Sequence, residues 1–292
     1  MNVHKRKMGL GCEIMEIDVL LATKNACLEK GKETFIKCLD RIFNEIRVHN
    51  LIVVDAESID ETLSIVEAFR QEYDNVLILR QSNLDGGIGK AWEQGFSQMN
   101  TDWFAIISSD CILLHNWQQT MEKYLGDSVG IVDGYEQDPT STDIQYSEAM
   151  SLLRKRIAKK DRTRSPGFSG SVLIRTSCVK DIRIPKIFRK GCDVFLKRKV
   201  LDKGYKCVLT EELVAEHRGA YLYSPSARAQ NAGALVRVLN LKSFSTIILN
   251  LVKAFPKALF TSLRYRTPIF LYVIVREWQT LVGWLHWTEH YF

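Results

Sequence analysis

A carboxylate directly follows a short apolar run near the middle of the chain. Residues 103–107 are apolar and strand-favouring in type, and Ser108, Ser109 and Asp110 end the run. Such a run, bounded by turn residues, predicts a buried central strand. Ligands of open α/β sheets bind at the carboxyl ends of the strands, which makes Asp110 a candidate ligand-binding side chain. Ser and Asp are also common in turns, so Asp110 as a turn cap is the other interpretation.

Polar side chains also end two earlier apolar runs. Residues 17–21 lead to Thr23 and Asn25, which are natural occupants of a strand-to-loop exit, and residues 51–54 lead to Asp55. Each of these runs predicts a buried strand. The sequence leaves open whether Asp55 meets a ligand or only caps the end of its strand.

The elements that carry these residues alternate between strand and helix. Residues 33–46 have apolar side chains at helical spacing, with one apolar face. Ser58 and Glu61 have the spacing of a capping box, which predicts that the next helix starts at Ser58 and ends near Glu72. Short loops and this alternation predict an α/β fold, a mostly parallel sheet flanked by helices. The further expected elements are strands 76–79, 102–107, 129–132, 171–174 and 206–209, and helices 91–99 and 192–203.

A Gly-rich stretch, residues 83–89, follows the third expected strand. A P-loop would need Gly at position 84 and Ser or Thr at position 91, where this chain has Leu84 and Ala91. The dinucleotide-binding pattern fails as well, because the glycines follow the third strand and lack its spacing. Lys90 lies beside these glycines, either as an anion-binding group or as a solvated charge on the first turn of a helix.

Composition fits an ordinary globular protein, with 46% hydrophobic and 25% charged residues in 292. The seven cysteines are scattered, and none has CxxC spacing, so the sequence suggests neither a disulfide framework nor a zinc site. This usage favours a reducing, cytosolic environment. Residues 1–15 form an expected tail without the apolar core of a secretory signal.

Taken together, the motifs resemble the family 2 glycosyltransferases, which have the GT-A fold and use nucleotide-diphosphate sugars. Thr23 and Asn25 match the opening motif of the family, and residues 55–62 (DAESIDET) match the motif after its second strand. Ser108-Ser109-Asp110 aligns with the metal-binding Asp-x-Asp motif, and Cys192-Asp193 aligns with the acceptor-side Glu-Asp pair. Further matches are residues 87–91 (GIGKA), residues 201–206 (LDKGYK) and His217, so the resemblance covers about residues 16–220.

The resemblance implies a role for each matched residue. Asp110 and His217 would bind a divalent cation, Mn²⁺ or Mg²⁺, although Ser108 stands where the family has its first Asp. Asp193 would be the general base of an inverting transfer, with Cys192 in place of the family's Glu. Asp193 as the N-cap of its helix, and His217 as an ordinary loop residue beside Arg218, are the other interpretations. The donor would be held by residues at the strand ends and in the Gly-rich stretch: Thr23, Asn25, Asp55, Lys90, Ser108 and Ser109.

The carboxyl-terminal segment differs from the rest of the chain. Residues 217–276 contain nine Lys or Arg and no acidic residue, so the net charge of +6 comes from this segment. Residues 243–263 and 267–287 are apolar but interrupted by charges and prolines, which disfavours spanning helices. We expect a catalytic domain at 16–222 and, at 223–292, basic amphipathic helices lying on a membrane surface at the cytosolic face. Packing of these helices on the catalytic domain or on a second subunit is the alternative.

Three other functions remain to be weighed. A non-catalytic protein that binds sugar nucleotides would keep the fold while losing the first metal-motif acid to Ser108. A nucleotidyltransferase would make nucleotide sugars rather than consume them. Nucleic-acid binding ranks low, because the basic segment is largely apolar and carries no recognised motif. A sugar-nucleotide donor, a sugar or lipid-linked acceptor and a membrane surface are therefore the expected partners.

Overall fold

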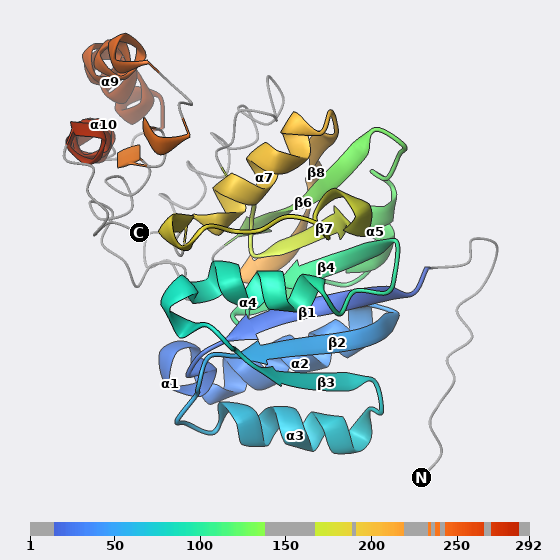
Figure 1. The fold of residues 1–292 in the computed structure, drawn as a ribbon. Coiled ribbons are helices and arrows are strands. Elements are labelled where there is room, and N and C mark those ends of the chain that lie inside the picture. The colour runs from blue at the N-terminus through green and yellow to red at the C-terminus, as the bar shows by residue number, and fades with distance from the viewer. Residues whose placement is uncertain are drawn as a thin grey trace.

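The computed structural model describes residues 15–137, 167–188, 191–218, 233–234, 237–239, 243–265 and 270–285. Within these residues one eight-stranded sheet has the order β3-β2-β1-β4-β7-β6-β8-β5 (Figure 1). The strands are β1 (Ile17–Thr23), β2 (Val48–Asp55), β3 (Val76–Arg80), β4 (Trp103–Ile107), β5 (Cys111–Leu113), β6 (Val129–Gln137), β7 (Ser171–Arg175) and β8 (Lys206–His217).

The first four strands form the parallel half of the sheet. β1 pairs in parallel with β2 and with β4, and β2 pairs in parallel with β3. β7 runs antiparallel to both β4 and β6, and β5 runs antiparallel to β8, while β6 and β8 are parallel. The prediction of a mostly parallel sheet is therefore confirmed for β1 to β4, and the second half of the sheet is mixed.

Helices cover both faces of this sheet (Figure 1). Side chains of α2, α3 and α5 pack into one apolar cluster with the sheet, and side chains of α4 and α7 pack into another. Along β1, Val19 and Leu21 enter the first cluster while Leu20 enters the second, as strand alternation requires. The helices are α1 (Ala26–Lys30), α2 (Lys32–Glu45), α3 (Thr62–Glu72), α4 (Gly87–Phe96), α5 (Trp117–Glu122), α7 (Cys192–Asp202), α9 (Phe244–Tyr265) and α10 (Phe270–Leu285).

Two expected helix starts were wrong. α3 begins at Thr62 rather than Ser58, because Ser58 donates its backbone N–H and its hydroxyl to the carboxylate of Asp55 and so stays in the loop. α4 begins at Gly87 rather than Ala91, so Gly87 and Gly89 lie in its first turn and not in an open loop. Gly95 of α4 lies so close to the sheet that a Cβ there would come within 2.3 Å of Leu20 Cδ1.

Two strands, β6 and β8, extend furthest beyond their predicted ends. β6 continues past Val132 to Gln137, and β8 continues past Leu209 to His217. The extra residues pair with each other across register shifts, from Tyr135 opposite Leu213 to Gln137 opposite Glu216. The basic segment 151–164, the tail 1–14 and the expected domain boundary at 222–223 lie outside the described residues.

The predicted carboxyl-terminal helical extension is present as α9 and α10. Their mutual contact includes Ile247 and Leu281, and Arg237 donates to the carbonyl of Trp284 at 2.8 Å. Ala234, three residues before Arg237, belongs to the apolar cluster of α4 and α7, so this residue contacts the side of the sheet that those helices cover. Among the described helices, none combines the length and the hydropathy needed to cross a membrane.

Candidate active site

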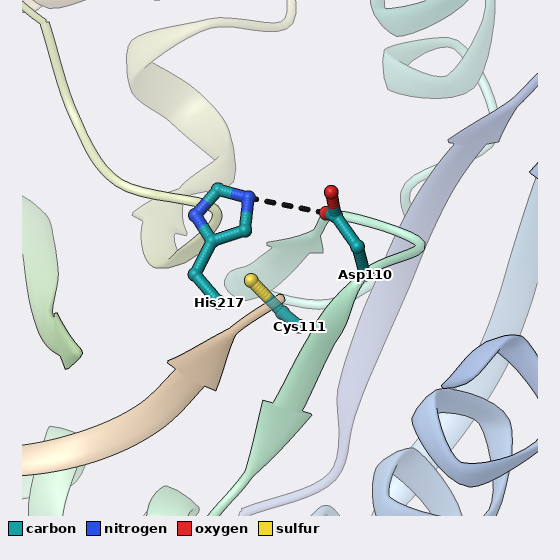
Figure 2. A group of neighbouring side chains, drawn as sticks. All are labelled: Asp110, Cys111 and His217. Carbon is teal, nitrogen blue, oxygen red and sulfur yellow. Dashed lines mark ion pairs between the residues drawn. The ribbon is translucent and has the colours of Figure 1, made fainter. Parts of the chain in front are cut away.

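The carboxyl edge of the sheet brings Asp110 and His217 together. Asp110 is the last residue of the turn between β4 and β5, a turn closed by the hydrogen bond from Cys111 N to Ser108 O at 2.9 Å. β5 then pairs antiparallel with β8, with Cys111 opposite His217. Residues more than 100 positions apart thus become neighbours, and the side chains of Asp110 and His217 point toward each other (Figure 2).

Four ionisable side chains form a continuous chain of contacts at this edge. His217 Nε2 lies 3.1 Å from Asp110 Oδ1, and His217 Nδ1 lies 3.0 Å from Glu136 Oε2. The second oxygen of Asp110, Oδ2, lies 3.0 Å from Lys30 Nζ. Asp110 and Glu136 are buried, whereas the His217 side chain is 26% exposed and can reach a ligand.

The charges of these four contacting side chains favour a protonated imidazole on His217. Burial alone would lower the pKa of His217, but hydrogen bonds and charges from Asp110 and Glu136 outweigh burial and raise the pKa to about 10. Burial would raise the pKa of both carboxyls, yet the partnership with His217 holds the pKa of Asp110 and that of Glu136 below the ordinary values. The imidazolium therefore lies between two carboxylates, a position that would also favour a metal cation.

The donor atoms at this place fit a divalent cation. One ligand atom each from Asp110, Cys111 and His217 lies within 4.8 Å of the others. A carboxylate oxygen and an imidazole nitrogen suit Mn²⁺. Burial and the charge of Glu136 raise the pKa of the Cys111 thiol well above its ordinary value, so Cys111 stays a thiol and is the weakest ligand of the three. Glu136, which contacts the other imidazole nitrogen, is placed as an orienting partner for His217.

The residues expected to hold the donor lie at the ends of β1 and β2. Thr23 pairs with Asp55 across the two strands, and the buried Thr23 Oγ1 has no hydrogen-bond partner in the described part of the chain. Asn25, with φ of 47°, donates its backbone N–H to Ser58 Oγ and accepts the N–H of Ile59. Asp55 is fully buried and accepts both bonds from Ser58 described above. This loop is therefore held by several hydrogen bonds, and a buried hydroxyl without a described partner lies beside it at the end of β1.

The other expected donor residues have different surroundings. Lys90 pairs with Glu93 on its own helix at 2.7 Å, and Glu93 in turn accepts the N–H of Ile184. Ser108 donates its N–H to Gly170 O at 2.7 Å, and a Cβ on Gly170 would lie 2.9 Å from both Ser108 Oγ and His217 Cε1. Ser109 is partly exposed beside Asp110. The structure therefore brings Ser108 next to His217, and it ties Lys90 to the α4–α7 face.

Asp193 lies in the first turn of α7, which begins after Gly191 in a left-handed conformation. Its side chain is half-buried, and burial raises its pKa, although backbone N–H groups of α7 and of Phe168 oppose the shift. A carboxylate in this position is available to accept a proton. Asp193 is thus in the helix start without being the N-cap, which is Gly191.

A short backbone segment, residues 167–170, links Asp193 to the His217 cluster. Its amides donate in succession to three carboxylates: Phe168 N to Asp193, Ser169 N to Asp133 at 2.8 Å, and Gly170 N to Glu136 at 3.1 Å. Lys197 of α7 donates to Gly167 O at 3.2 Å. We call residues 167–170 the strap. Burial raises the pKa of Asp133 to about 6, although Ser169 and Lys197 oppose that shift.

Three residues at this site have no counterpart in the sequence prediction: Lys30, Asp133 and Glu136. Lys30 ends the short helix α1, in a stretch between the predicted strand 17–21 and the predicted helix 33–46 where no helix was expected. Asp133 and Glu136 lie on the part of β6 beyond Val132, where the predicted strand ended. The sequence carried only a weak signal here. Residues 129–137 alternate apolar and polar side chains in part, and two acidic residues, Asp133 and Glu136, lie three positions apart among them.

Comparison with known proteins decides the family. The family model for "Glycosyl transferase family 2" matches residues 18–183, which is more than half of the chain. The chain belongs to this family. The matched residues include the strand ends of β1, β2 and β4 but stop before Asp193 and His217.

Related proteins agree with this membership. Over 195 residues the family 2 chain is 23% identical to glycosyltransferase AglE from Haloferax volcanii, a match that spans 63% of this chain and 62% of that relative. Mannosyltransferase PcManGT from Pyrobaculum calidifontis, solved with GDP-Man and Mn²⁺, has a TM-score of 0.59 at 13% identity, covering 92% of this chain and 74% of that one. TarS residues 1–349 of S. aureus, solved with UDP-GlcNAc, has a TM-score of 0.54 at 17% identity, covering 79% and 68%. These structures share the GT-A fold with the chain.

Proposed function

We propose that this family 2 chain is an inverting glycosyltransferase that moves a hexose from a nucleotide-diphosphate donor to a hydroxyl or phosphate acceptor. The observation that carries the proposal is the pairing of Asp110 and His217 at the carboxyl edge of the sheet. Asp193 is tied to the same edge through the strap. A cation-binding pair and a basic carboxylate joined in this way are what transfer from a diphosphate requires.

The donor fits the residues on the parallel half of the edge. The nucleoside would lie against the loop of Asn25 and Asp55, beside Thr23 at the end of β1. The diphosphate would lie toward Asp110, where Ser108 and Ser109 offer neutral donors. The structures of PcManGT and TarS named above contain GDP-Man and UDP-GlcNAc, which supports a donor of this chemical class.

A cation bound by Asp110 and His217, Mn²⁺ or Mg²⁺, would neutralise charge on the diphosphate when bound. Asp193 accepts the proton of the acceptor hydroxyl as that oxygen forms its bond to the anomeric carbon. The bond from the anomeric carbon to the diphosphate oxygen breaks, and its electron pair stays on the diphosphate. A phosphate acceptor that is already ionised needs no proton removed. Attack opposite the leaving group inverts the configuration of the sugar.

A thermal-shift screen of nucleotide-diphosphate sugars, with Mn²⁺, Mg²⁺ or chelator, tests the proposal. A ligand at a hundred times its dissociation constant stabilises a fold by about 2.7 kcal/mol. For a domain of this size that corresponds to a rise in Tm of roughly 5–10 °C. One donor is expected to give such a rise, larger with metal than with chelator. If none of the donors raises Tm under any of these conditions, the transferase proposal fails, and so does a non-catalytic role in binding sugar nucleotides.

The carboxyl-terminal helices suggest where the acceptor is held. Trp278 of α10 is exposed, and α9 places Lys253 and Lys257 beside a row of exposed apolar side chains. Basic edges beside apolar faces fit the surface of an anionic bilayer, so the protein would be peripheral at the cytosolic face and the acceptor a lipid-linked sugar or polyprenyl phosphate. The exposed apolar row of α9 consists of Leu249, Val252, Phe255, Leu259, Phe260 and Leu263.

Binding to lipid vesicles tests this placement. The protein is expected to sediment with vesicles that contain phosphatidylglycerol, and replacing Val252 and Leu263 by Ser should weaken that binding roughly tenfold, because two apolar side chains no longer enter the bilayer. Ile59→Ser is the control, since Ile59 is even more exposed than Val252 and Leu263 but lies on the sheet domain. Equal sedimentation of the double variant and the wild type would remove α9 from the proposed contact.

A further inference from the structure

Lys30 is the residue of this site that the donor scheme above leaves unused. It is the last residue of α1, and its Nζ lies 3.0 Å from Asp110 Oδ2 with the side chain 20% exposed. Two hydrogen bonds fix α1 against the start of α3 and the loop before it: Cys27 N donates to Thr62 Oγ1, and Leu28 N donates to Asp60 Oδ2. These hydrogen bonds hold α1 in place, and the position of α1 in turn places Lys30 beside Asp110.

The charges around Asp110 differ from those of a site built for metal alone. One carboxylate oxygen faces the imidazole of His217 and the other faces the ammonium of Lys30. Position 108, which follows the end of β4, carries a neutral hydroxyl rather than a second carboxylate. Compared with a pair of carboxylates, this arrangement has one negative charge fewer and a fixed positive charge more. It attracts an anion more strongly and a cation less strongly.

We propose that Lys30 binds the diphosphate of the donor, so that the site holds a nucleoside diphosphate even without a metal ion. This inference rests on the proposed function, because it places the diphosphate beside Asp110. An ammonium has three N–H donors, and the bond to Asp110 uses one of them. The others can meet phosphate oxygens, where a charged donor forms a strong hydrogen bond and counters the charge that develops on the leaving group.

The position of Lys30 also disfavours the binding of a metal ion at Asp110. The ammonium of Lys30 contacts Asp110 Oδ2, and a cation between Asp110 and His217 would use Oδ1, so two positive charges would share and repel each other across one carboxylate. Removing the ammonium is therefore expected to have opposite effects on two ligands. Diphosphate binding without metal should weaken, and metal binding without nucleotide should strengthen. A residue that merely supported the fold would not separate the two ligands in this way.

The chain contains a matched control lysine two residues further on. Lys32 Nζ lies 2.7 Å from Glu61 Oε1, and both side chains are more than half exposed. Lys32 therefore has the same charge and nearly the same place in the sequence, but its carboxylate partner lies away from Asp110. Lys30→Met removes the ammonium while keeping an unbranched side chain, and Lys30→Arg keeps a positive charge at the site.

Titration calorimetry with UDP and with GDP, in EDTA and in Mn²⁺, tests the proposal on the full chain. In EDTA the wild type should bind one of these nucleotides, and Lys30→Met should weaken that binding roughly tenfold or more. Lys30→Arg and Lys32→Met should stay within about threefold of the wild type, on the usual size of exposed charge effects. In nucleotide-free buffer, Lys30→Met should bind Mn²⁺ several-fold more tightly.

Each other outcome overturns the proposal in a recognisable way. If Lys30→Met binds the nucleotide in EDTA as the wild type does, Lys30 does not contact the diphosphate. If the wild type binds the nucleotide only in Mn²⁺, the metal carries the interaction and the transferase proposal stands without Lys30. If neither nucleotide binds under either condition, the proposed function fails together with this inference.

Discussion

Replacing Asp193 by Asn is expected to lower kcat by about 10²–10⁴-fold, the usual contribution of a positioned general base. The raised pKa of Asp193 shows a carboxylate with a greater readiness to take up a proton than one in water. Asn has nearly the same shape, and its amide oxygen can still accept the N–H of Phe168. The strap should therefore stay in place, and the donor should bind with little change in affinity. The measurement is the initial rate of transfer at saturating donor and acceptor.

Asp202→Asn is the matched control for this variant. Asp202 closes the same helix, α7, and pairs with Arg198 at 2.8 Å with both side chains exposed. Its replacement should leave kcat within about twofold, as for most surface pairs. A full rate of transfer in Asp193→Asn to a hydroxyl acceptor would show that another group removes the proton. A full rate with a phosphate acceptor alone would instead show that no proton has to be removed.

The apparent affinity for Mn²⁺ is expected to rise about tenfold for each pH unit between pH 6.5 and 8. Over that interval the imidazole of His217 carries a proton, because its pKa is raised to about 10. A metal ion that takes the imidazole nitrogen facing Asp110 must displace this proton, and the displacement becomes easier as the pH rises. The measurement is titration with Mn²⁺ at several pH values, in the absence of nucleotide.

Stability without metal should change in the opposite direction. The pKa of His217 in the fold lies above its ordinary value of 6.5, so the ion pairs of His217 stabilise the fold fully below about pH 6.5. That contribution is lost as the pH rises toward 10. The Tm of the metal-free protein should therefore fall over this interval, while the increase in Tm caused by Mn²⁺ grows.

His217→Gln separates the two effects from general pH dependence. It should lose most of the slope in Mn²⁺ affinity, since Gln carries no titrating proton. His115→Gln is the control, because the side chain of His115 is 81% exposed and lies by Glu45, away from Asp110. A slope that is the same in His217→Gln and in the wild type would mean that the metal binds without His217.

The sequence was most informative where local pattern and burial agree. The apolar runs that became β1, β2 and β4 each ended in polar residues, and those residues now lie at one edge of the sheet. Asp110 and His217 could be paired only through resemblance, because their contact depends on β5 pairing with β8. Local pattern alone does not specify which distant strands pair.

The residues that were missed depend on tertiary contacts. Glu136 belongs to a strand whose pairing with β8 passes through register shifts, which hide the alternation that marks a strand. Lys30 is an ordinary lysine in a short helix turn, and only the fold shows that it reaches Asp110. Ser58 had the spacing of a helix cap, but its hydroxyl donates a hydrogen bond to Asp55 instead. The neighbouring carboxylate therefore prevents the capping interaction that the local motif predicted.

The strap has a consequence for how the chain tolerates changes in length. Its three successive amides each have a carboxylate of their own, Asp193, Asp133 and Glu136. An inserted or deleted residue between Gly167 and Gly170 would shift the following amides by one position, so that each would face the wrong carboxylate. A Cβ at Gly167 would also come within 1.8 Å of Asp193 Oδ2, so a residue larger than glycine fits at this position only if the Asp193 side chain moves. Natural and engineered variants of this chain should therefore keep these four positions at constant spacing.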